Sequence, residues 1–445
     1  MKLTRLLSLW LVTGFLCAAA GPPNVILILA DDLAIGDLSC FNGGISRTPS
    51  LDRLVAESVY FEQAYAGSPV CAPSRAALFT GRYPHRTGSV TLNQIKFPEL
   101  TRLRLDETTI ADRFKAGGYA TGLVGKWHSG PGKEYHPLKR GFDEFVGFKD
   151  SLDIKTYFQY RLNLQGEIHE FDGPHLTDEF TRHAIDFVRR HRAKPFFPHL
   201  AHYAPHRPLS APEELIAHYR GKGLPEKTAI VYAMIEAMDR GVGELLHEVD
   251  RLGLSEKTMV IFASDNGPDP LVGDRFNGDN RGTKYRVNEG GIHVPLMVRW
   301  KEQFGPAKRG EVVHFVDFVP TLMEICGLKS SPDDKPFDGR SFAGLLSERW
   351  PMQQLPRQRF WQWNRKTPRY SHNAAIREGD WKLVRPYITR NIPKQPSTAA
   401  PRLYHLGNDP GESTDLAKQK ADLSRRLLNT LKDWAWEVER DRKRP

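Results

Sequence analysis

Four apolar segments of this sequence each run into side chains that bind cations or anions. The segments are Asn24–Ala30, Tyr119–Gly125, Pro195–Tyr203 and Thr258–Ser264. Each indicates a buried strand, because its residues are apolar on both faces. The groups that follow them are Asp31-Asp32, Lys126-Trp127-His128, Ala204-Pro205-His206 and Asp265-Asn266. Since ligands of open α/β sheets bind beyond the carboxyl ends of the strands, these four ends predict one shared site.

The acidic groups among them have the chemistry of a metal site. The candidate ligands all offer oxygen, and they are Asp31, Asp32, Asp265 and Asn266. Oxygen ligands suit Ca²⁺ or Mg²⁺ better than Zn²⁺. A nearby trio, His199, His202 and His206, could suggest zinc, but residues 199 and 202 would point to opposite faces of a strand. We therefore interpret His206 as functional and the other two as structural.

Cys71 begins a second pattern, Cys71-Ala-Pro73-Ser74-Arg75. Pro73 suits an early helical position, which puts Cys71 at a helix N-terminus where free N–H groups favour an anion. Arg75 would lie one turn further on, at the same end. A buried structural cysteine is the alternative. Outside residues 1–20 the chain has an odd number of cysteines, which are Cys40, Cys71 and Cys326. Either two of them form a disulfide and one is left, or all three are free thiols, or one of them is changed by chemistry.

The pattern Cys71-x-Pro73-x-Arg75, followed by Ala76-x-x-x-Thr80-Gly81, resembles the signature of the type I sulfatases of the alkaline phosphatase superfamily. The resemblance covers nearly the whole mature chain. Further matching segments are Pro23–Asp32, Gly125–His128, Ala204–Pro208, Ser264–Gly267 and Arg281–Lys284. It implies that a formylglycine-generating enzyme oxidises Cys71 to Cα-formylglycine before or during export, which would account for the odd thiol.

The resemblance also implies a reaction, the hydrolysis of sulfate esters. One hydroxyl of the hydrated formylglycine at position 71 would attack sulfur, and Arg75 and Lys126 would stabilise its alkoxide. His128 would take the proton of the second hydroxyl, so that sulfate leaves and the aldehyde returns. A serine could not do this, because a serine sulfate has no second hydroxyl to expel it.

Lys284 and His206 would bind the sulfate oxygens, and one of them would protonate the leaving alcohol. One Ca²⁺ would be held by Asp31, Asp32, Asp265, Asn266 and the modified Cys71. Two alternatives stay open. One is a phosphodiesterase or phosphonate monoester hydrolase on the same scaffold, and the other is a catalytically silent protein that binds sulfated glycans.

Helical segments alternate with the strands, which predicts an α/β fold. They are Thr48–Ser58, Asp106–Ala116, Asp178–His191 and Lys227–Leu252. With the resemblance, this predicts a large, mostly parallel sheet sandwiched by helices, as in alkaline phosphatase. We expect a catalytic domain over residues 21–330 and a smaller α+β domain over 331–445, with a last helix near Asp415–Glu437. Trp361, Trp363 and His372 would either stack on sugars or pack in the core.

Residues 1–20 have the features of a signal peptide, with Lys2 and Arg5 before the apolar run Leu6–Leu16 and a small-residue cleavage site at Ala18–Ala20. Its removal takes away two basic residues and lowers the formal charge from +10 to +8. We expect an exported protein, periplasmic or secreted, with no nucleic-acid partner and no stable membrane insertion after cleavage. The basic charge suits an anionic substrate, and a sulfated carbohydrate is the preferred class.

Overall fold

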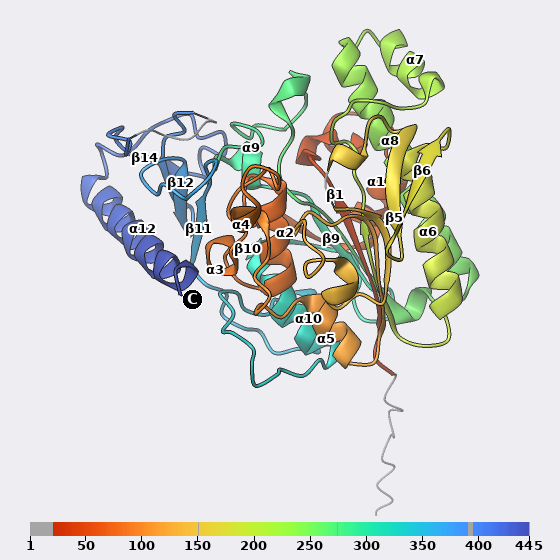
Figure 1. Ribbon diagram of the computed structural model, residues 1–445. Coiled ribbons are helices and arrows are strands. Elements are labelled where there is room, and N and C mark those ends of the chain that lie inside the picture. The colour runs from red at the N-terminus through yellow and green to blue at the C-terminus, as the bar shows by residue number, and fades with distance from the viewer. Residues whose placement is uncertain (1–20, 150, 274, 390–394, 445) are drawn as a thin grey trace, which may run out of the picture.

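Figure 1 shows the computed structural model of the chain, which describes residues 21–149, 151–273, 275–389 and 395–444. The signal peptide expected over residues 1–20 lies outside the described residues. Within the described ranges, none of the helices has the length and apolar character needed to cross a membrane.

Within those ranges a ten-stranded sheet is the centre of the molecule, with the order β10-β2-β9-β8-β1-β7-β3-β4-β5-β6. Its strands are β1 (Asn24–Ala30), β2 (Val59–Tyr65), β3 (Ala120–Lys126), β4 (Glu144–Phe148), β5 (Gln159–Leu164), β6 (Glu167–Asp172), β7 (Phe196–Ala201), β8 (Thr258–Ser264), β9 (Leu296–Arg299) and β10 (Ala307–His314). Strands β8, β1, β7, β3 and β4 run parallel to one another. The four strands expected from the sequence are therefore neighbours, and their carboxyl ends meet at one edge.

Helices cover both faces of this sheet (Figure 1). In β1, Val25, Leu27 and Leu29 belong to one buried core, whereas the residues between them belong to the other. The first core includes α2 (Cys71–Thr80), α5 (Ile110–Ala116) and α10 (Phe318–Cys326). The second includes α1 (Pro49–Glu57), α6 (Leu176–His191), α7 (Glu213–Gly221) and α8 (Glu226–Arg251). The expected α/β sandwich is confirmed.

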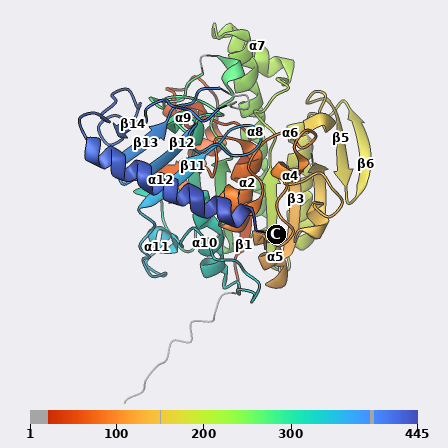
Figure 2. The ribbon, with the colours of Figure 1, turned by 60° about the vertical axis from the view of Figure 1, so that its left-hand side comes forward.

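The last part of the chain forms a small antiparallel sheet with a long helix against it (Figure 2). The sheet contains β11 (Gln358–Gln362), β12 (Ala374–Glu378), β13 (Trp381–Arg385) and β14 (Arg402–His405), and the helix is α12 (Ala421–Arg442). Leu383 of this sheet and Leu427 of α12 belong to the same buried core as the side chains of α2. The α+β character is confirmed, and the division after residue 330 stays a prediction. The remaining short helices are α3 (Pro84–Thr87), α4 (Pro98–Thr101), α9 (Glu289–Ile292) and α11 (Ala343–Leu346).

Two helix starts differ from the sequence prediction because side chains redirect the backbone. Helix α5 begins at Ile110 rather than near residue 106, since Thr109 Oγ1 accepts from the backbone N–H of Asp112, and Asp112 accepts from that of Thr109. Helix α12 begins at Ala421 rather than near residue 415. There the Asp415 carboxylate accepts from the backbone N–H of Leu403 and holds that segment against β14.

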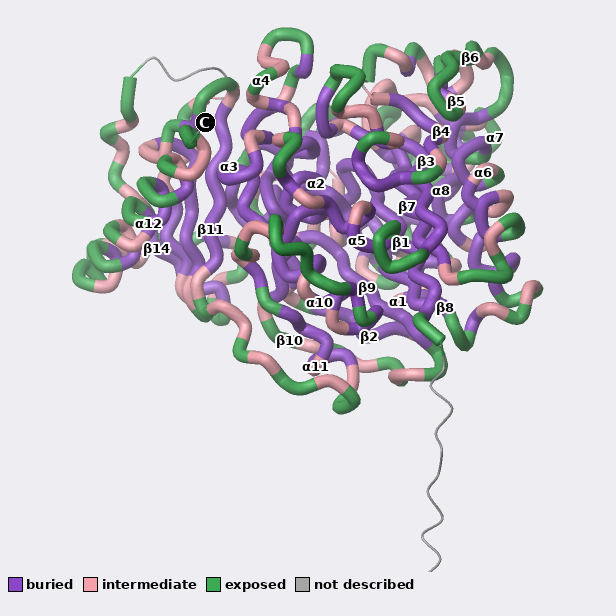
Figure 3. Tube along the Cα trace, turned by 60° about the horizontal axis from the view of Figure 1, so that its bottom comes forward, coloured by how far each residue is buried: buried purple, intermediate pink, exposed green. Residues whose placement is uncertain are grey.

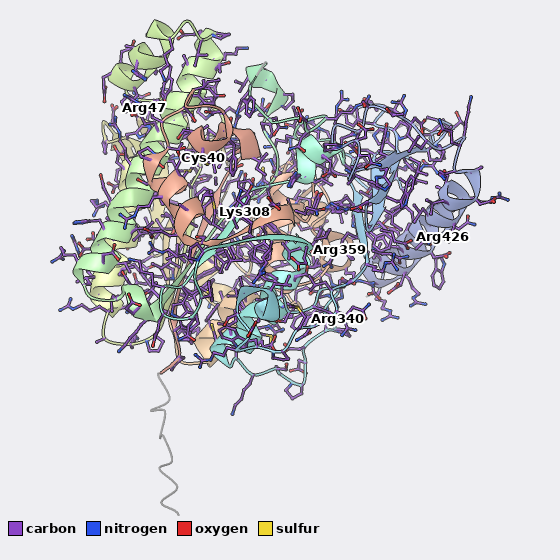
Figure 4. All side chains as sticks on the ribbon, turned by 180° about the vertical axis from the view of Figure 1, so that it is seen from behind. Cys40, Arg47, Lys308, Arg340, Arg359 and Arg426 are labelled. Carbon is purple, nitrogen blue, oxygen red and sulfur yellow. The ribbon has the colours of Figure 1, made fainter. Side chains whose placement is uncertain are left out.

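The three cysteines of the described chain are unpaired. Cys40 is exposed on the far side of the molecule (Figure 4), whereas Cys71 and Cys326 are buried. A disulfide between Cys40 and Cys326 is therefore absent from this part of the chain. Trp361 and Trp363 are also buried, and Trp361 Nε1 donates to the carbonyl of Ala66 at 2.9 Å. These rings pack in the core rather than against a sugar.

A buried ion pair joins the small sheet to the residue just before α10 and leads to a stability prediction. Arg359 of β11 donates to Asp317 at 2.6 Å, and both side chains are almost completely buried. Asp317 also accepts from the backbone N–H groups of His314 and Arg340, each at 2.9 Å. We expect Asp317→Ala to lower the free energy of unfolding by about 3–5 kcal/mol, because it leaves a buried guanidinium unpaired.

Urea unfolding of the purified protein measures this change. The matched control is Arg426→Ala, which removes an exposed partner of Glu378 on the outer side of the same sheet (Figure 4). Surface pairs of this kind contribute about 1 kcal/mol or less. Equal effects of the two substitutions would contradict the importance of the Asp317 pair.

Candidate active site

The carboxyl ends of β1 and β8 bring four acidic and amide side chains together. Asp31 and Asp32 directly follow β1, and Asp265 and Asn266 follow β8, whose last residue is in register with Ala30. All four side chains are buried. The backbone N–H of Asp32 donates to Asp265 Oδ1 at 3.3 Å, and Asn266 Nδ2 donates to Asp32 Oδ1 at 2.6 Å. Asp32 has φ 66°, a left-handed conformation that non-glycine residues seldom adopt and that is concentrated at functional sites.

Cys71 is the first residue of α2, as the sequence predicted. All ten residues of this helix are buried, which holds its N-terminus firmly against the edge of the sheet. Cys71 Sγ lies 3.5 Å from Asp31 Oδ1 and accepts a hydrogen bond from Lys284 Nζ at 3.2 Å. One turn along the helix, Arg75 Nε donates to Asp265 Oδ2 at 2.9 Å. Cys71 therefore lies between the acidic cluster and a lysine.

Buried positive charges balance the carboxylates. Lys126, the last residue of β3, donates to Asp31, and Lys284 donates to both oxygens of Asp32 at 2.6 and 2.8 Å. Burial alone would lower the pKa of each lysine, but the neighbouring aspartates raise it above the ordinary value. Burial would raise the pKa of Asp31 and Asp32, yet the lysines lower it. Burial and Asp31 raise the pKa of Asp265 to about 6.

The two candidate catalytic histidines have an unprotonated nitrogen at neutral pH. His206 Nδ1 donates to the carbonyl of Arg207 at 2.6 Å, which leaves Nε2 as the acceptor, 3.7 Å from Asp32 Oδ2. Burial lowers the pKa of His206 to about 3. His128 has φ 54°, and its buried Nδ1 has no hydrogen-bond partner in the described chain. Burial, Lys126 and Arg75 lower the pKa of His128 well below its usual range.

The other two histidines of the trio do not join the site. His199 lies in β7 and packs edge-on against Phe79 of α2, with ring centroids 5.5 Å apart. His202 is buried beyond the end of β7, where Asp178 and His175 are its neighbours. The two rings therefore lie on opposite sides of the sheet, as the strand period predicted.

A pocket of about 480 Å³ opens over this cluster. Four of the candidate catalytic residues line it, and they are Cys71, His128, His206 and Lys284. Arg75 and Lys126 lie behind its wall and are buried; both contact Asp31. The structure thus brings all six candidates to one place, four against the pocket and two supporting the acidic cluster from behind.

Sequence reasoning missed several residues of this pocket. Arg207 at its rim is held by Asp269 at 2.9 Å, and its Nη2 donates to the hydroxyl of Tyr285 at 3.1 Å. The Tyr203 ring lies 5.3 Å from Lys126 Nζ. Arg207 directly follows His206 and Tyr285 directly follows Lys284, so their place in the sequence beside two predicted site residues could have indicated them. The segments around residues 92–95 and 151–155 also line the pocket, but no sequence pattern marked them.

The donor atoms present fit a hard divalent cation. One donor atom each from Asp31, Asp32, Cys71 and His206 lies within 4.8 Å of the others. Asn266 Oδ1 is buried and has no hydrogen-bond partner in the part of the chain that is described. Asp265 lies outside the four-residue group but adjoins it through Asp32. Together with Asp265 and Asn266, the site offers four residues with carboxylate or amide oxygens, which are the ligand atoms that hard divalent cations prefer.

The small C-terminal sheet holds the loop that carries Lys284. Asn373, just before β12, donates through Nδ2 to the carbonyl of Tyr285 at 2.7 Å and accepts through Oδ1 from the backbone N–H of Val287 at 3.1 Å. Asn373 is completely buried and has φ 45°. The buried Asn373 side chain thus holds the backbone at Tyr285 and at Val287, directly after Lys284.

The Asn373 hydrogen bonds clamp this loop, and a second group of buried contacts, around Glu412, clamps it as well. Glu412 accepts from the backbone N–H of Glu289 at 2.8 Å, and Lys382 Nζ bridges Glu289 at 2.7 Å and Glu412 at 3.1 Å. Arg281 donates to the carbonyl of Glu412 at 2.7 Å. Glu412 is fully buried and also has a left-handed backbone, with φ 51°. Neither Asn373 nor Glu412 belongs to a pattern that the sequence analysis identified.

Two family models match the chain. The model described as Sulfatase matches residues 23–328, and the model described as N-sulphoglucosamine sulphohydrolase, C-terminal, matches residues 283–437. The two matches overlap over residues 283–328, which include Lys284. The first covers well over half of the chain and includes every candidate site residue.

Known proteins similar to this chain are sulfatases. N-acetylgalactosamine-6-sulfatase of Mus musculus is 31% identical over 93% of this chain and 86% of its own length. Arylsulfatase A of Homo sapiens is 31% identical over 97% and 90%, respectively. The crystal structure of Ps i-CgsB in complex with k-i-k-neocarrahexaose superposes with a TM-score of 0.79, at 29% identity over 94% of this chain and 93% of that one. This chain therefore belongs to the sulfatase family and is a sulfuric ester hydrolase.

Proposed function

We propose that this sulfatase is an exported enzyme that removes sulfate from carbohydrates, with a formylglycine made from Cys71 as its nucleophile and one bound Ca²⁺. The observation that carries the proposal is the position of Cys71. Its Sγ faces the pocket from the N-terminus of α2, 3.2 Å from Lys284 Nζ and 3.5 Å from Asp31 Oδ1. A nucleophile there has a cation for the sulfate and an acidic cluster for a metal ion.

The properties of the unmodified thiol support its conversion. Burial and Asp31 raise the pKa of Cys71, so the group is a protonated thiol at neutral pH and a poor nucleophile. Formylglycine supplies, once formed and hydrated, one hydroxyl to attack sulfur and a second to release the sulfate. Arg75 and Lys126 supply fixed positive charge beside this position, which stabilises negative charge on oxygen.

The pocket residues have separate tasks in this proposal. Lys284 reaches both Cys71 and Asp32, so its ammonium is placed to bind a sulfate oxygen and to donate a proton. His206 presents Nε2 to the same space, and once this nitrogen carries a proton it would bind a sulfate oxygen or protonate the leaving oxygen. The unpartnered Nδ1 of neutral His128 is suited to accept a proton from the hydrated group at position 71.

Ca²⁺ would be held by Asp31, Asp32, Asp265 and Asn266 together with the modified residue 71. The ion would act as a Lewis acid that polarises the oxygen groups bound to it. The orphaned Asn266 Oδ1 supports this set, because a buried amide oxygen without a partner costs free energy unless a ligand satisfies it. The partners implied are a sulfated carbohydrate substrate and a formylglycine-generating maturation enzyme, with no nucleic acid.

Carbohydrate is the proposed substrate class because one similar protein is named for a sugar and another was crystallised with an oligosaccharide. One is named N-acetylgalactosamine-6-sulfatase, and Ps i-CgsB was crystallised with a neocarrahexaose. The mature charge of +8 also favours an anionic polymer. Export would follow from the signal peptide expected over residues 1–20, and we expect a periplasmic or secreted enzyme without stable membrane insertion.

Mass analysis of the peptide that contains Cys71 tests the proposal. Protein recovered from the export pathway of its native host should show a loss of about 18 Da at this residue, the change for cysteine converted to formylglycine. The same preparation should hydrolyse sulfate esters in preference to matched phosphate esters. Active protein with an unmodified thiol would overturn the assignment of formylglycine at position 71 as the nucleophile. A preference for phosphate esters would support the phosphodiesterase or phosphonate hydrolase alternative, and glycan binding without turnover would support the silent binding protein.

The clamp on the Lys284 loop leads to a further prediction. We expect Asn373→Ala to lower kcat by about tenfold to a hundredfold, because it frees the backbone that aims Lys284 at the sulfate. Asn408→Ala, an exposed site beyond β14, is the control and should leave kcat unchanged. Steady-state kinetics on a small aryl sulfate measures the effect. A loss of folded protein with normal kcat in the remainder would show that Asn373 serves stability alone.

A further inference from the structure

A second cavity adjoins the catalytic pocket. It has a volume of about 460 Å³, close to the 480 Å³ of the pocket over Cys71. Both volumes are within the usual range of small-molecule sites, about 300–1,000 Å³. Leu152 and Lys155, between β4 and β5, line both cavities. The two cavities therefore adjoin at these two residues, and we call the second one, bounded by the β5–β6 hairpin, the hairpin groove.

The hairpin turns a polar face toward this groove. Tyr160 and Phe171 lie opposite each other in the antiparallel pair and stack at 5.2 Å; they pack against the core and also line the second cavity. Side chains alternate along a strand, so their neighbours point the other way. Those neighbours are Gln159, Arg161, Glu170 and Asp172, and all four line the second cavity. Figure 3 shows the hairpin at the rim of the molecule, with much of its surface exposed.

The charges of the second cavity are mixed. Arg161 donates to Asp153 at 2.8 Å, and Gln159 Nε2 donates to Asp172 Oδ1 at 3.4 Å. Two cations, Lys155 and Arg161, face three carboxylates, those of Asp153, Glu170 and Asp172. This balance gives no attraction for a second sulfate group. It offers donors and acceptors side by side, which suits sugar hydroxyls, because each hydroxyl both donates and accepts.

We propose that the β5–β6 hairpin forms a second sugar subsite, which binds an unsulfated ring linked to the sulfated ring in the catalytic pocket. The inference rests on the proposed carbohydrate sulfatase function and adds to it that the substrate has at least two rings. Lys155, exposed at the junction of the two cavities, lies where the glycosidic link would cross.

Asp172→Ala is the most informative variant, because the subsite predicts weaker binding of sulfated disaccharides whereas simple electrostatics predicts stronger binding. Loss of a negative charge alone would strengthen binding of any anionic substrate. Loss of a carboxylate that accepts from sugar hydroxyls should instead lower kcat/KM for sulfated disaccharides by about tenfold, mainly through KM. Turnover of 4-nitrophenyl sulfate should stay within about twofold of wild type. The matched control is Glu167→Ala on the same strand, whose carboxylate is highly exposed and does not line the cavity.

The substrates for this test are 4-nitrophenyl sulfate, galactose 6-sulfate, and sized di- and tetrasaccharides from carrageenan and chondroitin sulfate. Calorimetric binding of the same oligosaccharides to Cys71→Ala protein gives a readout independent of turnover. Equal losses on short and long substrates, or no loss on any, would overturn the subsite and leave the sulfatase proposal intact. Binding that depends on Asp172 but leads to no turnover of any sulfate ester by matured protein would support the subsite and overturn the proposed reaction. Absence of both binding and turnover would overturn both.

Discussion

Cys71→Ala is expected to lower kcat for a sulfate ester by about 10³-fold or more, because removal of a nucleophile abolishes most of the catalysis that depends on it. The side chain is small and buried at the start of α2, so alanine fits the same space. We expect the midpoint of thermal unfolding to stay close to that of the wild type. Cys40→Ala, which changes an exposed thiol on the far side of the molecule, is the control and should keep full activity.

Cys71→Ser separates the proposed chemistry from a general need for a nucleophile at this position. A serine hydroxyl can attack sulfur, but its sulfate ester has no second hydroxyl to expel the sulfate. We expect no steady turnover and a gain of about 80 Da on the peptide, as for a trapped covalent intermediate. Steady turnover by either variant at the wild-type rate would remove Cys71 from the mechanism.

Asp32→Asn is expected to weaken Ca²⁺ binding by at least about tenfold, because it removes one charge from a cluster that depends on carboxylates. Activity should fall by about a hundredfold or more at limiting Ca²⁺, since the metal and Lys284 both depend on this side chain. In the wild type, added Ca²⁺ should raise the midpoint of thermal unfolding, as for any ligand that binds only the folded state. That shift measures binding without reference to activity.

Two comparisons make the metal experiment specific. Asp178→Asn, an exposed carboxylate on α6, should keep the wild-type response to Ca²⁺. Asn266→Ala should reduce the response without changing the charge of the site, because it deletes the orphaned Oδ1 together with the Nδ2 hydrogen bond to Asp32. If chelator treatment and added Ca²⁺ affect the wild type and Asp32→Asn equally, Asp32 is not a ligand of the ion.

Much of the fold was visible in the sequence because local patterns and burial agree. The four apolar segments are strands, and β1 and β8 have the predicted bounds. Continuous apolar runs indicate strands covered on both sides, and the structure has helices on both faces. The position of Cys71 at a helix start was also local information, since Pro73 and the residues after it specify the helix.

Other features could not be predicted because they depend on segments far apart in the chain. Asn373 lies 88 positions from Tyr285, the residue whose carbonyl it holds, and no local pattern links them. The starts of α5 and α12 were placed too early, because a capping threonine and an aspartate that bonds to another segment outweighed helix periodicity. The hairpin groove adjoins the catalytic pocket because Leu152 and Lys155 line both cavities, and no sequence pattern marked the 151–155 segment.

The sequence by itself determined the chemistry of this protein: which residues follow the strands, which cysteine begins a helix, and which acids supply oxygen. These properties belong to single residues and short spacings. Only the tertiary structure decided how they act together. It set Lys284 within 3.2 Å of Cys71, placed Arg75 and Lys126 behind the pocket, and placed the hairpin groove beside the pocket. Distances between remote segments depend on how the sheet orders its strands and on how both cores pack, and neither is written in any one stretch of chain.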